Sequence, residues 1–142
     1  MTFKQWLESV DTFPRAEDLS TFMSYAHTVS IRTHQAMFRN AKTPEQKALM
    51  KEIIDLADLL GHIHKNIEGR LPEISDGDKF QGKPTPSLQI NQYQHKFPDL
   101  PSVLRVLRTI GSHYFIEKPT SQALSDRLNS LNSALQHART AV

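Results

Sequence analysis

The sequence predicts an all-α protein, a bundle of four long helices preceded by one short N-terminal helix. Apolar residues recur at spacings of three and four over most of the chain, which is the period of one buried helical face. Prolines and glycines lie at the ends of these periodic segments, where helices start and stop. The alternation typical of a strand is suggested only around Leu88 and Ile90.

The first two helices are predicted before residue 41. A short helix over residues 2–10 presents one apolar face: Phe3, Trp6, Leu7 and Val10. Residues 11–14 interrupt the pattern, and a long amphipathic helix follows from about residue 14 to 40. Its apolar stripe consists of Leu19, Phe22, Met23, Ala26, Val29, Ser30, Thr33 and Met37.

The third helix has the clearest signals. Thr43, Pro44 and Gln46 have the order of an N-cap, a first-turn proline and the residue that closes a capping box. The seam that follows, of the kind found in coiled coils, comprises Leu49, Ile53, Leu56, Leu60, Ile63 and Ile67. Gly69 and Pro72 are expected to end this helix.

Residues 72–98 are predicted to form a long loop between the third and fourth helices. The stretch SDGDKFQGKPTPS combines glycine, proline and scattered charge. Long loops of this kind are typically functional or disordered, and residues 73–87 are expected to be the most mobile part of the chain. Phe80, Tyr93 and Phe97 indicate that part of the loop docks on the bundle.

Two more helices complete the single domain expected over residues 1–142. The fourth begins at Asp99-Leu100-Pro101 and is expected to continue through Gly111, almost unbroken, as far as Pro119. Its seam is Val103, Leu107, Ile110 and Tyr114. The fifth covers about residues 120–138, with a seam of Leu124, Leu128, Leu131, Leu135 and Ala138. The connectivity of the bundle stays open, because the 72–98 loop is long enough for either return path.

Composition excludes several classes of protein. The chain contains no cysteine, which excludes disulfides, thiolate metal sites and a cysteine nucleophile, and we expect a cytoplasmic location. No run approaches the roughly eighteen apolar residues of a membrane helix, and the N-terminus lacks the pattern of a secretory signal, so we expect no membrane partner. Seventeen basic and fifteen acidic residues give a formal net charge of +2, which is nearly balanced.

Histidines and carboxylates offer weak metal-binding patterns. His27 and His34 are seven residues apart, about 10.5 Å along a helix, which is too far for one metal ion. Asp58 and His62 have the i, i+4 spacing of two ligands on one turn, but no second pair appears on another helix. We therefore expect Asp58 and His62 to be surface residues, and we expect no metal and no other cofactor.

Three arginines are weak candidates for binding a nucleic acid. Arg32 and Arg39 are expected on the outer face of the second helix and Arg105 on the fourth. Nearby lysines are interrupted by acidic residues, and no aromatic residues alternate with them, as in an ordinary solvated surface.

The segment LRTIGSHYF, residues 107–115, carries the one candidate catalytic pair. In a continuous helix Arg108 and His113 would point about 140° apart, but a break at Gly111 would let both turn to one side. An arginine that steadies a phosphate beside a histidine that moves a proton suits the cleavage of RNA through its own 2′-hydroxyl.

This segment resembles the active-site region of the HEPN family of helical-bundle ribonucleases, in which an arginine is followed a few residues later by a histidine. The resemblance implies that Arg108 and His113 are the active pair. It covers nine residues and departs from the family pattern at two places. Thr109 follows the arginine where Asn, Asp or His is common, and Phe115 occupies the place of a frequent tyrosine, with Tyr114 one residue earlier.

The sequence thus favours a non-catalytic interaction or regulatory protein that acts through a protein partner or through self-association as a homodimer. The alternative is a metal-independent, HEPN-like ribonuclease or RNA-binding bundle that uses Arg108 and His113. The sequence does not decide whether the protein is an enzyme, and it favours a protein without catalytic activity.

Overall fold

The computed structural model describes residues 16–74, 93–110 and 115–140. Four helices account for most of these residues: α2 (Ala16–Phe38), α3 (Pro44–Ile74), α5 (Leu100–Thr109) and α6 (Lys118–Thr140). No strand occurs within these ranges, so the predicted all-α class is confirmed for the part of the chain that is described. The predicted helix at residues 2–10 and residues 75–92 of the predicted loop lie outside it.

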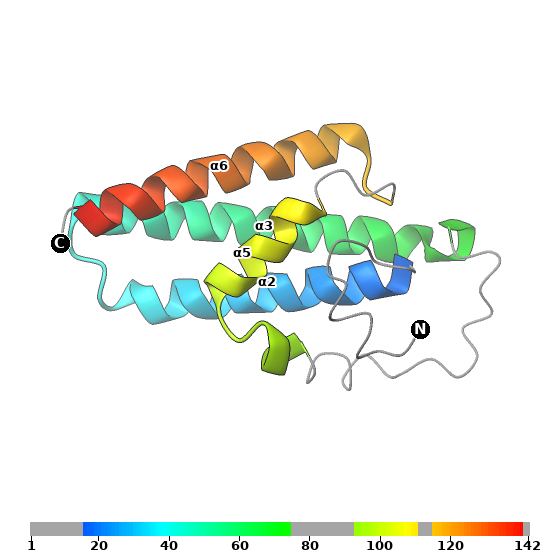
Figure 1. Ribbon diagram of the computed structural model, residues 1–142, viewed down its shortest axis with the longest axis horizontal. Helices are drawn as coiled ribbons and strands as arrows, with labels where there is room; N and C mark the ends of the chain where they lie inside the picture. Colours follow the sequence, from blue (N-terminus) through cyan, green and yellow to red (C-terminus); the bar gives the residue numbers. More distant parts are fainter. Residues whose placement is uncertain (1–15, 75–92, 111–114, 141–142) are drawn as a thin grey trace.

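Three long helices, α2, α3 and α6, lie side by side, and each runs in the opposite direction to the one before it (Figure 1). α3 packs against both α2 and α6. The prediction of four long helices needs correction at α5, which has only 10 residues. In Figure 1 this short helix lies obliquely across α2 and α3, and it packs against α2 and α6.

The start of α3 follows the predicted capping box. The backbone N–H of Gln46 donates to Thr43 Oγ1 at 3.1 Å, and the backbone N–H of Thr43 donates to Gln46 Oε1 at 3.2 Å. These two bonds satisfy donors that a helix N-terminus otherwise leaves open. All six seam residues of this helix are buried, including Leu56 and Leu60, as predicted: Leu49, Ile53, Leu56, Leu60, Ile63 and Ile67.

The end of α3 lies further along the chain than predicted. The helix passes through Gly69 and Pro72 and ends at Ile74. A proline so close to the C-terminus removes a single backbone hydrogen bond. The last turns are also held from outside, because Arg70 Nη1 donates to the carbonyl oxygen of Phe115 at 3.1 Å.

α5 begins as predicted and ends earlier than predicted. Asp99 and Ser102 form a capping box, in which the Ser102 N–H donates to Asp99 Oδ1 at 3.1 Å. The helix ends at Thr109, and Ile110 has φ −96° and ψ 2°. Residues 115–117 are not helical either, so the prediction of an almost unbroken helix to Pro119 is wrong.

Burial explains this early end of α5. Ile110, Phe115 and Ile116 are all buried, although one continuous helix would point them in different directions. Breaking the helix lets all three enter the core. The hydroxyl of Thr109 also donates to the Val106 carbonyl at 2.7 Å, the kind of local bond that competes with helix propagation.

Aromatic side chains dock the end of the predicted loop on α2, as the sequence suggests. Residues 93–96 form one helical turn, and Tyr93 and Phe97 are buried. Both rings pack edge-to-face on Phe22, with centroid distances of 5.6 and 5.8 Å. Two hydroxyl groups complete the contact, since Tyr93 donates to the Asp18 carbonyl at 3.3 Å and Tyr25 donates to the Phe97 carbonyl. Phe80 lies outside the described residues.

His27 links α2 to α3 in the middle of the bundle. Its Nδ1 lies 2.7 Å from the carbonyl oxygen of Ala57, and it must be the donor because a carbonyl only accepts. The ring lies over Gly61, where a Cβ atom would come within 3.3 Å of it. None of the helices described here is long and apolar enough to cross a membrane.

Candidate interaction groove

Of the candidate catalytic pair, only Arg108 lies within the described residues. Arg108 is exposed in the last turn of α5, and its Nη2 donates to Asn132 Oδ1 on α6 at 3.2 Å. His113 lies in the segment 111–114, outside the described residues, as does the break point Gly111. The convergence of Arg108 and His113, which the alternative ribonuclease hypothesis requires, therefore stays a hypothesis.

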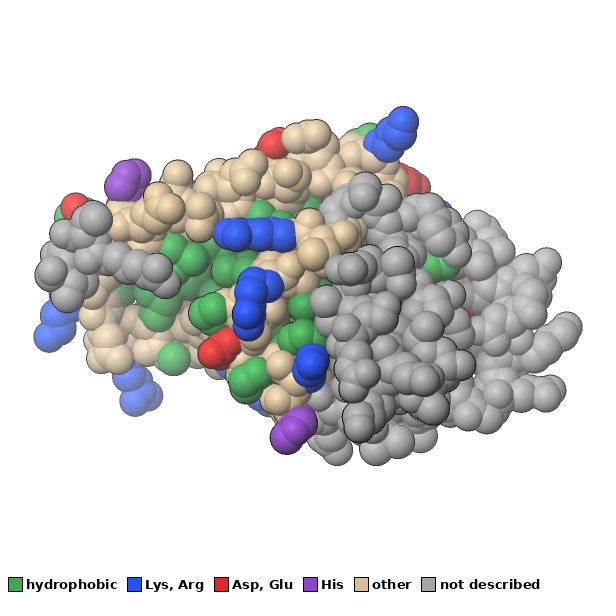
Figure 2. Space-filling model, in the orientation of Figure 1, with side chains coloured by type: hydrophobic (Ala, Val, Ile, Leu, Met, Phe, Trp, Pro, Cys, Tyr) green, Lys and Arg blue, Asp and Glu red, His purple; other side chains and the backbone are tan. Residues whose placement is uncertain are grey.

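The three arginines predicted for nucleic-acid binding are all exposed. Figure 2 shows Lys and Arg side chains gathered over α5. Arg32 and Arg105 each influence the ionisation of one nearby residue, Tyr25 and Asp99 respectively. Burial raises the pKa of Tyr25, and Arg32 partly opposes that rise. Hydrogen bonds from Ser102 lower the pKa of Asp99, with a smaller effect of Arg105.

Arg39, the third of these arginines, follows the end of α2 at Phe38. It lies seven residues beyond Arg32 in the sequence, and a nucleic-acid interface formed by these three arginines stays a prediction.

Asp58 and His62 are expected from the sequence to be surface residues of the third helix. Asp58 and His62 are both exposed. No group of three His, Asp or Glu side chains that could hold a metal ion occurs in the described ranges. Two other histidines have different contacts: His27 binds the Ala57 carbonyl, and His64 Nε2 lies 3.1 Å from Glu68 Oε1.

A surface groove that the sequence did not indicate follows the line where α3 meets α6. Two adjoining hollows of about 760 and 330 Å³ share Ser130 and together define what we call the α3–α6 groove. From α3 it is lined by Pro44, Glu45, Ala48, Glu52, Asp55 and Leu59. From α6 it is lined by Ala123, Asp126, Arg127, Ser130, Ser133, Ala134 and His137.

Small side chains beside the buried seams produce this groove. The seam of α6 is anchored in the core by Leu124, Leu128 and Leu131. Next to it, alanine and serine occupy the positions that face α3, so little side-chain volume fills the space above the seam: Ala123, Ser130, Ser133 and Ala134. Ala48 does the same from α3. The groove is therefore shallow, open and bounded by two helices that the core holds in place.

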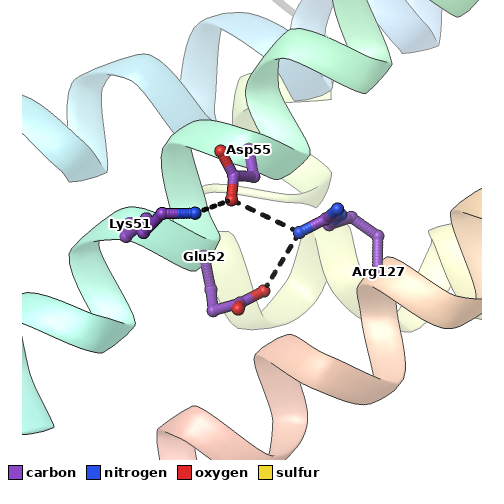
Figure 3. A network of polar contacts seen from close by, with 4 residues as sticks. All are labelled: Lys51, Glu52, Asp55 and Arg127. Atoms are coloured by element: carbon purple, nitrogen blue, oxygen red, sulfur yellow. Dashed lines mark hydrogen bonds and ion pairs between the residues drawn. The ribbon is translucent and has the colours of Figure 1, made fainter.

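An ion-pair network crosses the groove (Figure 3). Arg127 Nη1 of α6 lies 3.3 Å from Asp55 Oδ2 and 3.5 Å from Glu52 Oε2, both on α3. Lys51 Nζ reaches the same Asp55 oxygen at 2.9 Å. The two arginine contacts are longer than the 2.7–2.9 Å typical of strong charge-assisted bonds, and both use one nitrogen of the guanidinium group.

Glu52 is the less satisfied of the two carboxylates. Its Oε2 is within ion-pair range of Arg127, yet this oxygen is buried and makes no hydrogen bond within the described structure. At 3.5 Å and with poor alignment, the contact with Arg127 is too weak to count as a hydrogen bond. Charge attraction alone joins Arg127 to Glu52.

The lining of the groove is predominantly acidic. Four carboxylates face one arginine and one histidine: Glu45, Glu52, Asp55 and Asp126. Along the sequence, Glu45, Glu52 and Asp55 only break up a set of lysines, because Arg127, the partner of Glu52 and Asp55, is more than 70 residues away. The small residues beside the leucine seam of α6 are the one sequence signal that could have indicated the groove.

Comparison with known protein families, curated proteins and solved structures gives no match for this chain. A function for the chain therefore has to be inferred from the geometry of the described residues. Within them, the α3–α6 groove combines shape and charge, whereas Arg108 and the exposed arginines are single contacts or parts of a mixed surface.

Proposed function

We propose that this protein is a non-catalytic interaction module that binds a protein partner through the α3–α6 groove. The observation that carries the proposal is the extent and openness of the groove. From Pro44 to Leu59 it follows 16 residues of α3, a rise of about 22 Å. Sites for small molecules are typically enclosed and bury most of the ligand, whereas an open trough between two helices suits a segment of another protein.

The buried seam residues and the groove-lining residues are different sets of positions, which supports this proposal. None of the residues that line the groove belongs to the buried core cluster, although Leu59 and Ala134 pack against it. Ala48, Ser130 and Ser133 are exposed. Rigid helices that present a fixed, non-core surface are a suitable basis for recognition, because little ordering is required when a partner binds.

Site-specific photo-crosslinking in the cells of origin tests the proposal. A photo-reactive residue at Ser133, inside the groove, should give a discrete covalent adduct with a protein, which can be a second copy of this chain. The same residue at Ser125, an exposed serine of α6 outside the groove, is the matched control. Equal labelling from both positions, or no adduct from Ser133, would contradict the proposal.

A ribonuclease that uses Arg108 and His113 is the second candidate, and one observation favours it. Because α5 ends at Thr109, no continuous helix holds the two side chains about 140° apart. If the pair is catalytic, His113→Ala should lower the cleavage rate of single-stranded RNA by about 10²–10⁴-fold, with the melting temperature unchanged. A purified protein without RNA cleavage would eliminate this candidate.

A further inference from the structure

Building on the proposed interaction function, we infer that the α3–α6 groove takes a basic amphipathic helix of about 15 residues. Its Lys or Arg side chains would pair with the carboxylates of the groove, and its small or apolar residues would lie on the groove floor. The inference concerns the chemistry of the partner, which the proposed function leaves undefined.

The charge of the groove indicates a cationic partner. Glu45, Glu52 and Asp55 line its α3 side, and Asp126 lines its α6 side. Arg127, shared between Glu52 and Asp55, and Lys51, which pairs with Asp55, offset part of this charge. The excess of carboxylates lies on the α3 wall, and a net negative charge in a groove attracts a partner of the opposite sign and speeds its association.

The spacing of the carboxylates indicates a helix rather than an extended strand. Glu45 and Glu52 are seven residues apart, two helical turns or about 10.5 Å. A helix laid along the groove presents its own residues i and i+7 with the same rise, so one cation can meet each carboxylate. An extended chain covers that distance in about three residues and points alternate side chains away from the groove.

The floor of the groove permits a close approach. Ala48, Ala123 and Ala134 add only methyl groups between the two walls. Helices pack at axial distances of about 8–10 Å when the side chains at the contact allow it, and small residues allow the shorter distances. The partner face that fits therefore combines small apolar residues with flanking Lys or Arg.

Among the groove carboxylates, Glu52 should contribute most to the binding of a partner cation. Its buried Oε2 makes no hydrogen bond within the described structure, and its contact with Arg127 is long. An incoming ammonium or guanidinium group that displaces Arg127 and exposes this oxygen supplies the missing donor. Arg127, whose side chain is 39% exposed, occupies this position in the free protein and competes with the partner. Removing Arg127 should therefore strengthen binding, while removing the Glu52 charge should weaken it.

The probe for this inference is a stapled 15-residue alanine helix with lysines seven residues apart, labelled for fluorescence anisotropy on the full chain. The same peptide with glutamate in place of lysine is its control. We expect the lysine peptide to bind and the glutamate peptide not to bind. Binding should weaken with added salt, which screens exposed charges.

Variants locate the site. Glu52→Gln should weaken binding of the lysine peptide about fivefold, and Arg127→Gln should strengthen it by a similar factor. Asp58→Asn is the matched control, because Asp58 is an exposed acid of α3 outside the groove and its loss changes the net charge equally. Glu45→Gln gives a second reading inside the groove should Glu52→Gln lower the melting temperature.

The outcomes separate this inference from the proposed function. Equal binding of both peptides, or equal weakening by Asp58→Asn and Glu52→Gln, overturns the basic helix, because net charge alone would then explain the result. If Ser133 crosslinks a protein but the lysine peptide does not bind, the interaction function is supported and the chemistry inferred for its partner is wrong. No adduct and no binding overturn both.

Discussion

Gly61 and Gly69 offer a test of the packing between α2 and α3. Both are inside α3, but they have different surroundings. A Cβ atom at Gly61 would lie 3.3 Å from Cε1 and Nδ1 of His27, whereas one at Gly69 would meet nothing within 4 Å. Gly69→Ala should stabilise the protein by about 0.5–1 kcal/mol, because alanine loses less backbone entropy in a helix.

Gly61→Ala should lack this gain. Carbon atoms attract best at about 3.5–4.0 Å, so the new methyl group overlaps the His27 ring by a few tenths of an ångström. The ring is held by its 2.7 Å hydrogen bond to the Ala57 carbonyl and cannot move without lengthening that bond. Overpacking of this kind typically costs about 1–3 kcal/mol, which makes Gly61→Ala less stable than Gly69→Ala by that amount.

Urea unfolding followed by circular dichroism measures both variants against the wild type. A further comparison uses His27→Ala as the background. Without the imidazole ring the overlap disappears, so Gly61→Ala should then stabilise by the same amount as Gly69→Ala. If Gly61→Ala already matches Gly69→Ala in the wild-type background, the contact does not constrain the interface and the reasoning is refuted.

Three further outcomes follow from the structure. Leu56 is fully buried in the seam of α3, so Leu56→Ala should lower the free energy of unfolding in urea by about 2–5 kcal/mol. A loss well below that range would contradict the tight packing of this position. Tyr25→Phe removes the hydroxyl that donates to the Phe97 carbonyl and should cost about 0.5–1.5 kcal/mol; an unchanged unfolding midpoint would contradict this. The pKa of Asp99 is lowered by its bonds to Ser102, so its contribution is complete above the ordinary aspartate pKa and is lost as pH falls through the lower folded value. The melting temperatures of wild type and Asp99→Ala should therefore converge in acid, and a constant gap would exclude the cap as the cause.

The sequence by itself determined where helices begin and which faces they bury. Helix starts depend on neighbours within one turn, such as Thr43 with Gln46 and Asp99 with Ser102. Burial of the seam depends on the helical period alone, so Leu56 and Leu60 could be placed in the core without any knowledge of the partner helices.

Helix ends were decided by contacts between distant segments. Arg70 joins the last turns of α3 to the Phe115 carbonyl, 45 residues away, and the helix continues through both Gly69 and Pro72. α5 ends early because the core takes up both Ile110 and Phe115. Local signals cannot record such gains.

Only the tertiary structure created the α3–α6 groove. Asp55 and Arg127 are 72 residues apart, and their meeting requires α3 and α6 to pack in one particular register. In the sequence the acidic residues of α3 and the small residues of α6 each have an ordinary local explanation. Their combination into one acidic trough arises because burial of the two leucine-rich seams fixes which remaining positions face each other across the surface.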